Sequence, residues 1–94
     1  MEFEWDKSKA ATNLKKHKVT FDEACTVFSD SLARIFDDED HSAEERREII
    51  VGHSILGRLI LVCFTERDED VIRIFSAREV TGNERKDYEE NASS

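Results

Sequence analysis

The amino-acid sequence predicts a small α+β domain in which an antiparallel sheet carries its helices on one face. Its 94 residues are enough for one hydrophobic core and too few for two, so we expect residues 1–94 to form a single domain. Two segments with helical spacing of apolar residues precede a series of strand-like segments, and one more helical segment follows. The expected order is β-α-α-β-β-β-β-α, and helices grouped ahead of a β-meander are typical of α+β domains.

The first strand and the first helix follow from alternation and capping. Residues 2–5 alternate polar and apolar side chains, which predicts a short edge strand. Asp6 is a suitable N-cap for a helix over residues 7–17. In that helix Ala10, Leu14 and His17 share one face, and the opposite side is basic.

A second helix is expected over residues 21–29. It begins at a capping box formed by Thr20 and Glu23. Its core-facing positions, spaced at i, i+3, i+4 and i+7, are Phe21, Ala24, Cys25 and Phe28.

Four strands and a last helix complete the expected fold. The strands are predicted at residues 32–36, 46–54, 59–64 and 71–77, with the apolar run 59–64 at the centre of the sheet and Gly52 as a candidate bulge. The acidic residues 37–40 indicate a loop, followed by a single capped turn at residues 42–45. A capping box of Thr81 and Glu84 opens a helix that runs to about residue 90.

The net charge of −8 argues against a nucleic-acid-binding protein, but the charge is unevenly distributed. Residues 30–57 hold eight acidic and three basic side chains, whereas residues 1–29 are neutral. Five lysines, at positions 7, 9, 15, 16 and 18, form a basic helix face that either binds phosphates or is merely solvated.

No apolar run approaches the roughly 20 residues of a membrane span, and no secretory signal is recognisable, so we expect a cytoplasmic protein. Cys25 and Cys63 lack metal-ligand spacing and are assigned to packing as reduced thiols.

Arginine, glutamate and tyrosine side chains near the end of the chain suggest phosphoryl chemistry. Glu84 and Tyr88 lie one helical turn apart, directly after Arg78. A base, a proton donor and a cation are what cleavage of RNA requires, although capping by Glu84 and packing by Tyr88 explain the same residues. Arg73 lies inside an apolar strand, where it either pairs with a carboxylate or lines a groove. Strict alternation would place Arg73 and Arg78 on opposite faces of the sheet. The two can act together only if a bulge intervenes or the strand ends before Arg78. The sequence contains no known motif for binding a metal or a nucleotide, and neither His17 nor His53 is part of a motif.

The sequence resembles the BrnT family of bacterial toxins from about Phe3 to Glu89. In the first half the resemblance is carried by Phe3-Glu4-Trp5-Asp6, Lys9, Asn13, Lys16-His17, Val19, Phe21, Glu23-Ala24, Phe28 and Asp30. In the second half it is carried by Glu45-Arg46, Gly52-His53-Ser54, Gly57-Arg58, Val62, Phe64-Thr65-Glu66-Arg67, Ile72-Arg73-Ile74, Ser76-Ala77-Arg78, Glu84-Arg85 and Tyr88-Glu89.

The resemblance implies a RelE/ParE-like fold and a ribonuclease toxin of a type II toxin-antitoxin system, which arrests translation and growth. It implies neutralisation by a BrnA-type antitoxin in a 2:2 or larger complex that binds promoter DNA only through the antitoxin, with no membrane contact, no cofactor and no metal. The implied catalytic residues are Arg78, Glu84, Tyr88 and Arg73, with Arg58, Lys16 and His17 as RNA contacts. In these roles Arg73 and Arg78 hold the scissile phosphate, Glu84 is the base, and Tyr88 orients or donates a proton.

One departure from the family pattern concerns the end of the first helix. Lys18 stands where these toxins usually have glycine after the Lys-His pair. The chain must therefore either make the left-handed turn at a cost in conformational free energy or turn in a different backbone conformation. Two alternatives to an active nuclease remain: a binding module that captures a basic antitoxin, and a toxin that acts on another target such as gyrase.

Overall fold

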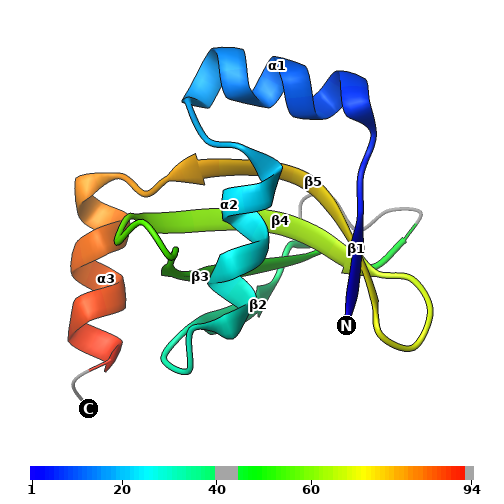
Figure 1. Ribbon diagram of the computed structural model, residues 1–94. Helices are drawn as coiled ribbons and strands as arrows, with labels where there is room; N and C mark the ends of the chain where they lie inside the picture. Colours follow the sequence, from blue (N-terminus) through cyan, green and yellow to red (C-terminus); the bar gives the residue numbers. More distant parts are fainter. Residues whose placement is uncertain (40–44, 93–94) are drawn as a thin grey trace.

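A five-stranded sheet forms the centre of the computed structural model, which describes residues 1–39 and 45–92 (Figure 1). Its strands are β1 (Glu2–Glu4), β2 (Arg34–Asp37), β3 (Glu48–His53), β4 (Leu59–Glu66) and β5 (Val71–Glu79). The helices are α1 (Lys7–His17), α2 (Phe21–Thr26), which continues into the 3₁₀ turn η1 (Val27–Ser29), and α3 (Gly82–Ala92). The predicted order of strands and helices is confirmed, and the capped turn expected at residues 42–45 lies outside the described residues except for Glu45.

The sheet is mixed, so the prediction of an antiparallel sheet is wrong for one strand. The strand order is β1-β5-β4-β3-β2, and β2, β3, β4 and β5 form an antiparallel meander. β1 instead pairs parallel with the start of β5, with Glu2 opposite Val71 and Glu4 opposite Arg73. Most of the chain separates β1 from β5, and such a long connection permits a parallel pair that a short hairpin would forbid.

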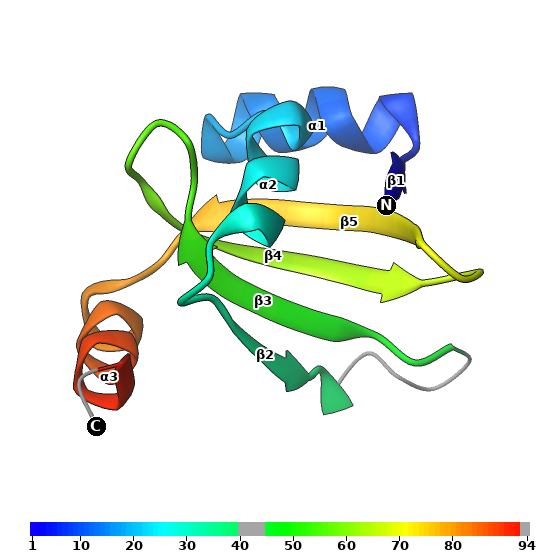
Figure 2. The ribbon, with the colours of Figure 1, turned by 60° about the horizontal axis from the view of Figure 1, so that its bottom comes forward.

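The main core lies between one face of the sheet and the segment formed by α2 and η1. Its buried residues are Val19, Phe21, Ala24, Val27, Ile50, Ile60, Val62, Phe64, Ile72, Ile74 and Ala77. Thr20 caps α2 by accepting from the Glu23 N–H at 3.0 Å, which is one half of the predicted capping box, while the Glu23 carboxylate accepts from Ser54 and Arg58 instead. Figure 2 shows α2 lying across the strands on this face, which we call the core face.

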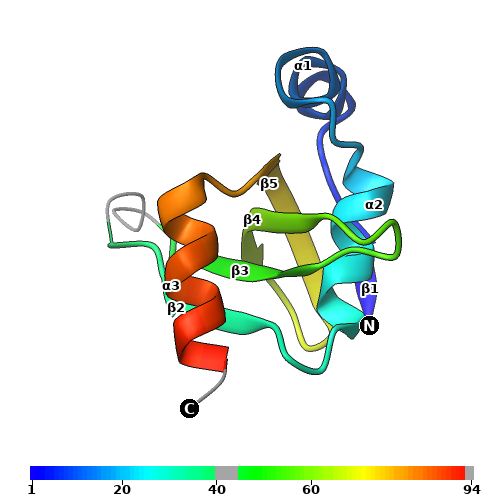
Figure 3. The same cartoon turned by 90° about the vertical axis from the view of Figure 1, so that its left-hand side faces the viewer.

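The third helix lies on the opposite face, so the expectation that all helices share one face is wrong. Tyr88 of α3 packs with Val51 and Leu59, whose side chains point away from the main core. Figure 3 shows the sheet between α2 and α3. The helix follows β5 after only Val80 and Thr81, and it covers one end of this second face. We call the rest of that face the open face.

The first helix covers the edge of β5 instead of an apolar surface. Asn13 is buried, whereas Leu14, expected on the inner side, is 46% exposed. The Asn13 side chain donates to the Ala77 carbonyl at 2.8 Å and accepts from the Ala77 N–H at 3.0 Å. β1 pairs only with the first residues of β5, so Asn13 replaces a neighbouring strand for the part of the edge that β1 leaves open. α1 ends at Lys18 with φ 60° and ψ 30°, which confirms a left-handed residue at this position.

A bulge in β5 changes which side chains face the open face. Phe64 pairs with Ile74 and Cys63 pairs with Ser76, so Phe75 is an extra residue on β5. The bulge brings Arg73 and Arg78 to the same face, which strict alternation would forbid. Gly52 does not form a bulge; it lies in regular β3, where an added Cβ would be 2.8 Å from the Ala33 Cβ.

Candidate active site

Arg78 and Glu84 meet where β5 ends and α3 begins. The Glu84 carboxylate accepts hydrogen bonds from both terminal nitrogens of the Arg78 guanidinium, at 2.8 and 2.9 Å. The predicted capping box holds the same carboxylate, because the Thr81 N–H donates to Glu84 Oε1 at 2.8 Å and the Glu84 N–H donates to Thr81 Oγ1 at 3.2 Å. Both side chains of the ion pair are about one-third exposed. The start of α3 therefore orients a guanidinium at the border of the open face.

The Arg78 guanidinium lowers the pKa of Glu84 to about 2, and the Thr81 N–H adds to this effect. Glu84 in turn raises the pKa of Arg78. A carboxylate this acidic is a weak proton acceptor at neutral pH, because general-base strength falls with pKa. Within residues 1–39 and 45–92, Arg78 Nε has no hydrogen-bond acceptor, so this edge of the guanidinium can take an anion.

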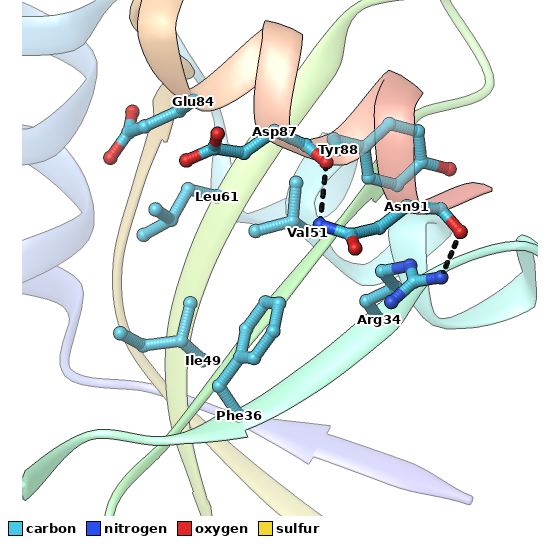
Figure 4. A pocket seen from close by; sticks show the side chains of 9 residues that line it. All are labelled: Arg34, Phe36, Ile49, Val51, Leu61, Glu84, Asp87, Tyr88 and Asn91. Carbon is cyan, nitrogen blue, oxygen red and sulfur yellow. Dashed lines mark hydrogen bonds between the residues drawn. The ribbon is translucent and has the colours of Figure 1, made fainter. Parts of the chain in front are cut away.

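Tyr88 lies on α3 one turn after Glu84, but its hydroxyl does not approach the ion pair. The Tyr88 hydroxyl donates to the Leu32 carbonyl at 3.1 Å, and its ring packs with Val51 and Leu59. The side chain is 7% exposed, and this burial raises the pKa of the phenol. Figure 4 shows the hydroxyl pointing away from the Glu84 carboxylate. These contacts anchor α3 to the sheet.

Two other arginines from the sequence prediction lie apart from Arg78 and have their own carboxylate partners. Arg73 donates to Glu4 at 2.6 Å and sits five residues before Arg78 on β5, roughly 16 Å away at strand spacing. Arg58 pairs with Glu23, whose side chain is only 5% exposed, and so ties the start of β4 to α2. The structure does not bring Arg73 or Arg58 to the Arg78 pair.

Lys16 and His17 line a groove of about 320 Å³ between α1 and β5. Lys9 lines the same groove from the preceding turns of α1, and Phe75 and Ser76 line it from β5. Ser76 is two residues before Arg78 on the same face, so the groove leads toward the ion pair.

Phe75 and Arg47 are site features that the sequence analysis missed. The Arg47 guanidinium carbon lies 4.0 Å from the centroid of the Phe75 ring, and Lys9 Nζ lies 5.3 Å from the same centroid. Both distances fall within the range of cation–π attraction. The only signal in the sequence is an aromatic residue beside Arg73 and Ser76, and no pattern indicates the bulge that turns Phe75 and Ser76 to the same side.

A second groove, of about 250 Å³, lies between α3 and the sheet (Figure 4). Its floor is apolar and consists of Phe36, Ile49, Val51 and Leu61. Its polar residues are Arg34 on β2 and Glu84, Asp87 and Asn91 on α3. The groove is adjacent to the Arg78 pair because Glu84 borders both.

Among the described residues, no three His, Cys, Asp or Glu side chains are grouped so that they could hold a metal ion. No helix in this part of the chain combines the length and the apolar character needed to cross a membrane. Cys25 and Cys63 are both free thiols, and burial raises the pKa of Cys25 to about 11.

Comparison with known proteins gives a family and a similar fold. The family described as "Ribonuclease toxin, BrnT, of type II toxin-antitoxin system" matches residues 5–84. The 1.1 Å crystal structure of the Brucella abortus ribonuclease toxin BrnT is similar to this chain with a TM-score of 0.67 and 24% sequence identity, over 86% of this chain and 97% of that one. Comparison with curated proteins gives no match.

The family match extends over both halves of the fold. It includes α1, the strands β2 to β5 and the capping box of α3 up to Glu84, and it begins just after β1. The crystal structure supports the same fold. The chain therefore belongs to the BrnT family of ribonuclease toxins of type II toxin-antitoxin systems.

Proposed function

We propose that this toxin cleaves RNA at Arg78 and that the reaction needs no metal ion. The observation that carries the proposal is the Arg78–Glu84 pair, which fixes a guanidinium beside the open face and leaves its Nε edge available. A planar guanidinium fits the oxygens of a phosphate, and it stabilises charge that develops there.

The reaction we propose is attack by a ribose 2′-hydroxyl on the adjacent phosphorus. The hydroxyl proton passes to solvent water, the 2′-oxygen bonds to phosphorus, the bond from phosphorus to the 5′-oxygen breaks, and the leaving oxygen takes a proton from solvent water. Arg78 would neutralise the negative charge that builds on the phosphate oxygens during this exchange.

The resemblance assigns proton transfer to Glu84 and Tyr88, and the geometry favours other roles. We propose that Glu84 positions Arg78, because its carboxylate is held by two guanidinium nitrogens and has a pKa of about 2. We propose that Tyr88 anchors α3 through Leu32. Arg73, Lys16 and His17 stay as proposed contacts for RNA phosphates, and Arg58 would act by holding β4 to α2.

Cleavage of RNA by the purified protein tests the role of Arg78. We expect Arg78→Gln to slow cleavage about 100-fold or more, as loss of a preorganised charge donor does, while Arg67→Gln, at an exposed arginine in the turn after β4, keeps wild-type rates. Wild-type cleavage should persist in excess chelator. Full activity of a folded Arg78→Gln protein would rule out the site, and loss of activity in chelator would rule out metal independence.

The variant Tyr88→Phe separates anchoring from proton transfer. Because the hydroxyl bonds to the Leu32 carbonyl, we expect a loss of about 1 kcal/mol in the free energy of unfolding and an unchanged cleavage rate. Urea denaturation and a cleavage assay at saturating RNA measure the two effects. A large fall in rate without a fall in stability would return the proton-transfer role to Tyr88.

We further propose that a BrnA-type antitoxin binds this toxin in the cytoplasm, in a 2:2 or larger complex that contacts promoter DNA through the antitoxin. The groove beside α3 supports this proposal, since an apolar floor bordered by Glu84 and Asp87 suits an amphipathic segment with basic residues. A segment bound there would lie against the Arg78 pair, which offers a direct route to inhibition.

The same groove, with its apolar floor and the carboxylates of Glu84 and Asp87, supports a second candidate function, a weakly catalytic module that mainly captures its antitoxin. A toxin with another target, such as gyrase, is the third candidate, and no contact in the structure favours it. Cleavage by the purified protein distinguishes the first function from both alternatives.

A further inference from the structure

We propose that the groove between α1 and β5 binds the sugar–phosphate backbone of single-stranded RNA next to the phosphate held at Arg78. This inference rests on the proposed ribonuclease function and names the part of the protein that holds the substrate beside the reacting bond.

The composition of the groove is opposite to that of the whole chain. The protein has a net charge of −8, yet the described residues that line this groove include Lys9, Lys16 and His17 and no aspartate or glutamate. Hydroxyl groups of Thr12 and Ser76 also line it, and they can donate to phosphate oxygens. A cationic groove with hydroxyl donors fits a polyanionic backbone.

A neighbouring hollow of about 190 Å³ extends the groove across the open face. The two hollows share Lys9, Phe75 and Ser76, and the second adds Arg47, Cys63 and one acid, Asp38. Arg47 stacks on the Phe75 ring with 4.0 Å between guanidinium carbon and ring centroid. Aromatic rings and arginine planes are the surfaces on which unpaired bases stack, so this arrangement favours single-stranded over duplex RNA.

The bulge in β5 connects the groove to the reaction site. It turns both Phe75 and Ser76 toward the open face, and Arg78 follows Ser76 by two residues, about 7 Å along the strand. A backbone lying in the groove would therefore reach Arg78 without crossing another element.

The helix that forms one wall of the groove also provides matched controls. Lys7 and Lys15 are exposed on α1 like Lys9 and Lys16, but they do not line the groove. The double variants Lys9→Gln/Lys16→Gln and Lys7→Gln/Lys15→Gln remove the same charge from the same helix, so their difference reports position and not net charge.

Binding of a fluorescent single-stranded RNA with 2′-O-methyl riboses tests the proposal, because such RNA cannot undergo 2′-hydroxyl attack. From the fluorescence anisotropy measured at several salt concentrations, we expect the Lys9/Lys16 variant to bind about tenfold more weakly than wild type. The slope of log affinity against log salt should fall by about 1.4, the value for two lost phosphate contacts on a single strand. The Lys7/Lys15 variant should keep the wild-type affinity and slope, and an RNA duplex of the same sequence should bind wild type more weakly.

Equal losses in the two double variants, or preference for the duplex, would overturn the groove as a single-strand site. Absence of binding by wild type would overturn it as well. The ribonuclease proposal is judged separately, by cleavage of unmodified RNA with wild type and Arg78→Gln, so the failure of one proposal is distinguished from the failure of the other.

Discussion

Arg58 and Arg78 both form ion pairs with a glutamate, and the partner of each decides what the arginine can do. Arg58 holds the buried Glu23 and lowers its pKa through a hydrogen bond, which makes this pair a link between β4 and α2. Arg78 instead pairs with Glu84, and both remain one-third exposed beside the open face. A partly exposed guanidinium can exchange contacts with an arriving phosphate, whereas one committed to a buried carboxylate cannot without leaving that charge unpaired.

The pKa of Glu84 gives a test based on stability against pH. Its folded-state pKa of about 2 lies below the ordinary 4.5, so ionised Glu84 stabilises the fold above about pH 4.5, and this contribution disappears as the pH falls toward 2. We expect Glu84→Gln to cost about 1 kcal/mol of unfolding free energy at pH 7, a value reduced for partial exposure, and almost nothing at pH 2.

Urea denaturation at both pH values measures this difference. Glu66→Gln, at an exposed glutamate on β4, serves as the control and should leave the pH dependence of wild type unchanged. A deficit of Glu84→Gln that is equal at pH 7 and pH 2 would mean that the carboxylate charge does not stabilise α3.

The left-handed residue at the end of α1 predicts a stabilising substitution. Lys18 has φ 60° and ψ 30°, a conformation that costs a non-glycine residue roughly 1–2 kcal/mol. Glycine at this position would remove that cost, but it also has more conformational freedom in the unfolded chain, which offsets part of the stabilisation. We therefore expect Lys18→Gly to raise the free energy of unfolding by up to about 1 kcal/mol. Lys18→Ala is the control, since it removes the charge and keeps the strain. Urea denaturation measures the two variants, and a urea midpoint for Lys18→Gly at or below that of Lys18→Ala would contradict the argument.

The edge of β5 is protected by a helix whose central buried group is an amide. Asn13 donates to the carbonyls of Ala77 and Val19 and accepts from the Ala77 N–H. It thus pairs both backbone groups of Ala77 as a neighbouring strand would, and it closes an edge that could otherwise pair with another chain. Asn13 also lines the groove in which Lys16 and His17 lie.

Removing this amide should loosen the edge. We expect Asn13→Ala to reduce the free energy of unfolding by about 2 kcal/mol, because a buried donor and acceptor of Ala77 lose their partner. Hydrogen exchange should become faster at the Ala77 N–H. Asn83→Ala, at an exposed position in α3, is the control, and similar losses in the two variants would show that Asn13 has no special role.

Local patterns in the sequence predicted the elements well, and long-range pairing explains the differences. Capping at Thr20 and Thr81 and the left-handed turn at Lys18 depend on neighbouring residues, and these local features are observed, although only Thr81 and Glu84 form the full reciprocal box. The parallel pairing of β1 and the position of α3 depend on segments far apart in the chain, for which periodicity gives no information. For the same reason sequence spacing suggested that Tyr88 would join Glu84, whereas packing against β3 and β4 turns its hydroxyl to Leu32.

At the level of the whole molecule, the charge is divided between two surfaces. The groove beside α1 is lined by lysines and histidine, whereas the groove beside α3 has two carboxylates, Glu84 and Asp87, and one arginine, Arg34. A net charge of −8 therefore describes the average and hides a cationic path. In the functions proposed above, RNA and a basic protein partner would bind to different surfaces that meet at Arg78.

This division of charge predicts how salt changes the rates at which the proposed antitoxin binds and dissociates. A basic antitoxin attracted by the acidic surface should associate more slowly as salt rises, with a smaller change in its dissociation rate, because long-range attraction acts on the encounter. Stopped-flow mixing of the two proteins measures both rates. The variant Asp87→Asn should reduce the salt dependence of association, and an association rate independent of salt would exclude electrostatic steering.

The most direct test of the account is the fate of bulk RNA when the chain is expressed with and without the proposed BrnA-type antitoxin. We predict rapid RNA decay and growth arrest with wild type alone, intact RNA with a folded Arg78→Ala protein, and intact RNA when the antitoxin is present. Growth arrest by wild type with intact RNA, or RNA decay unchanged by Arg78→Ala, would contradict a ribonuclease site at Arg78.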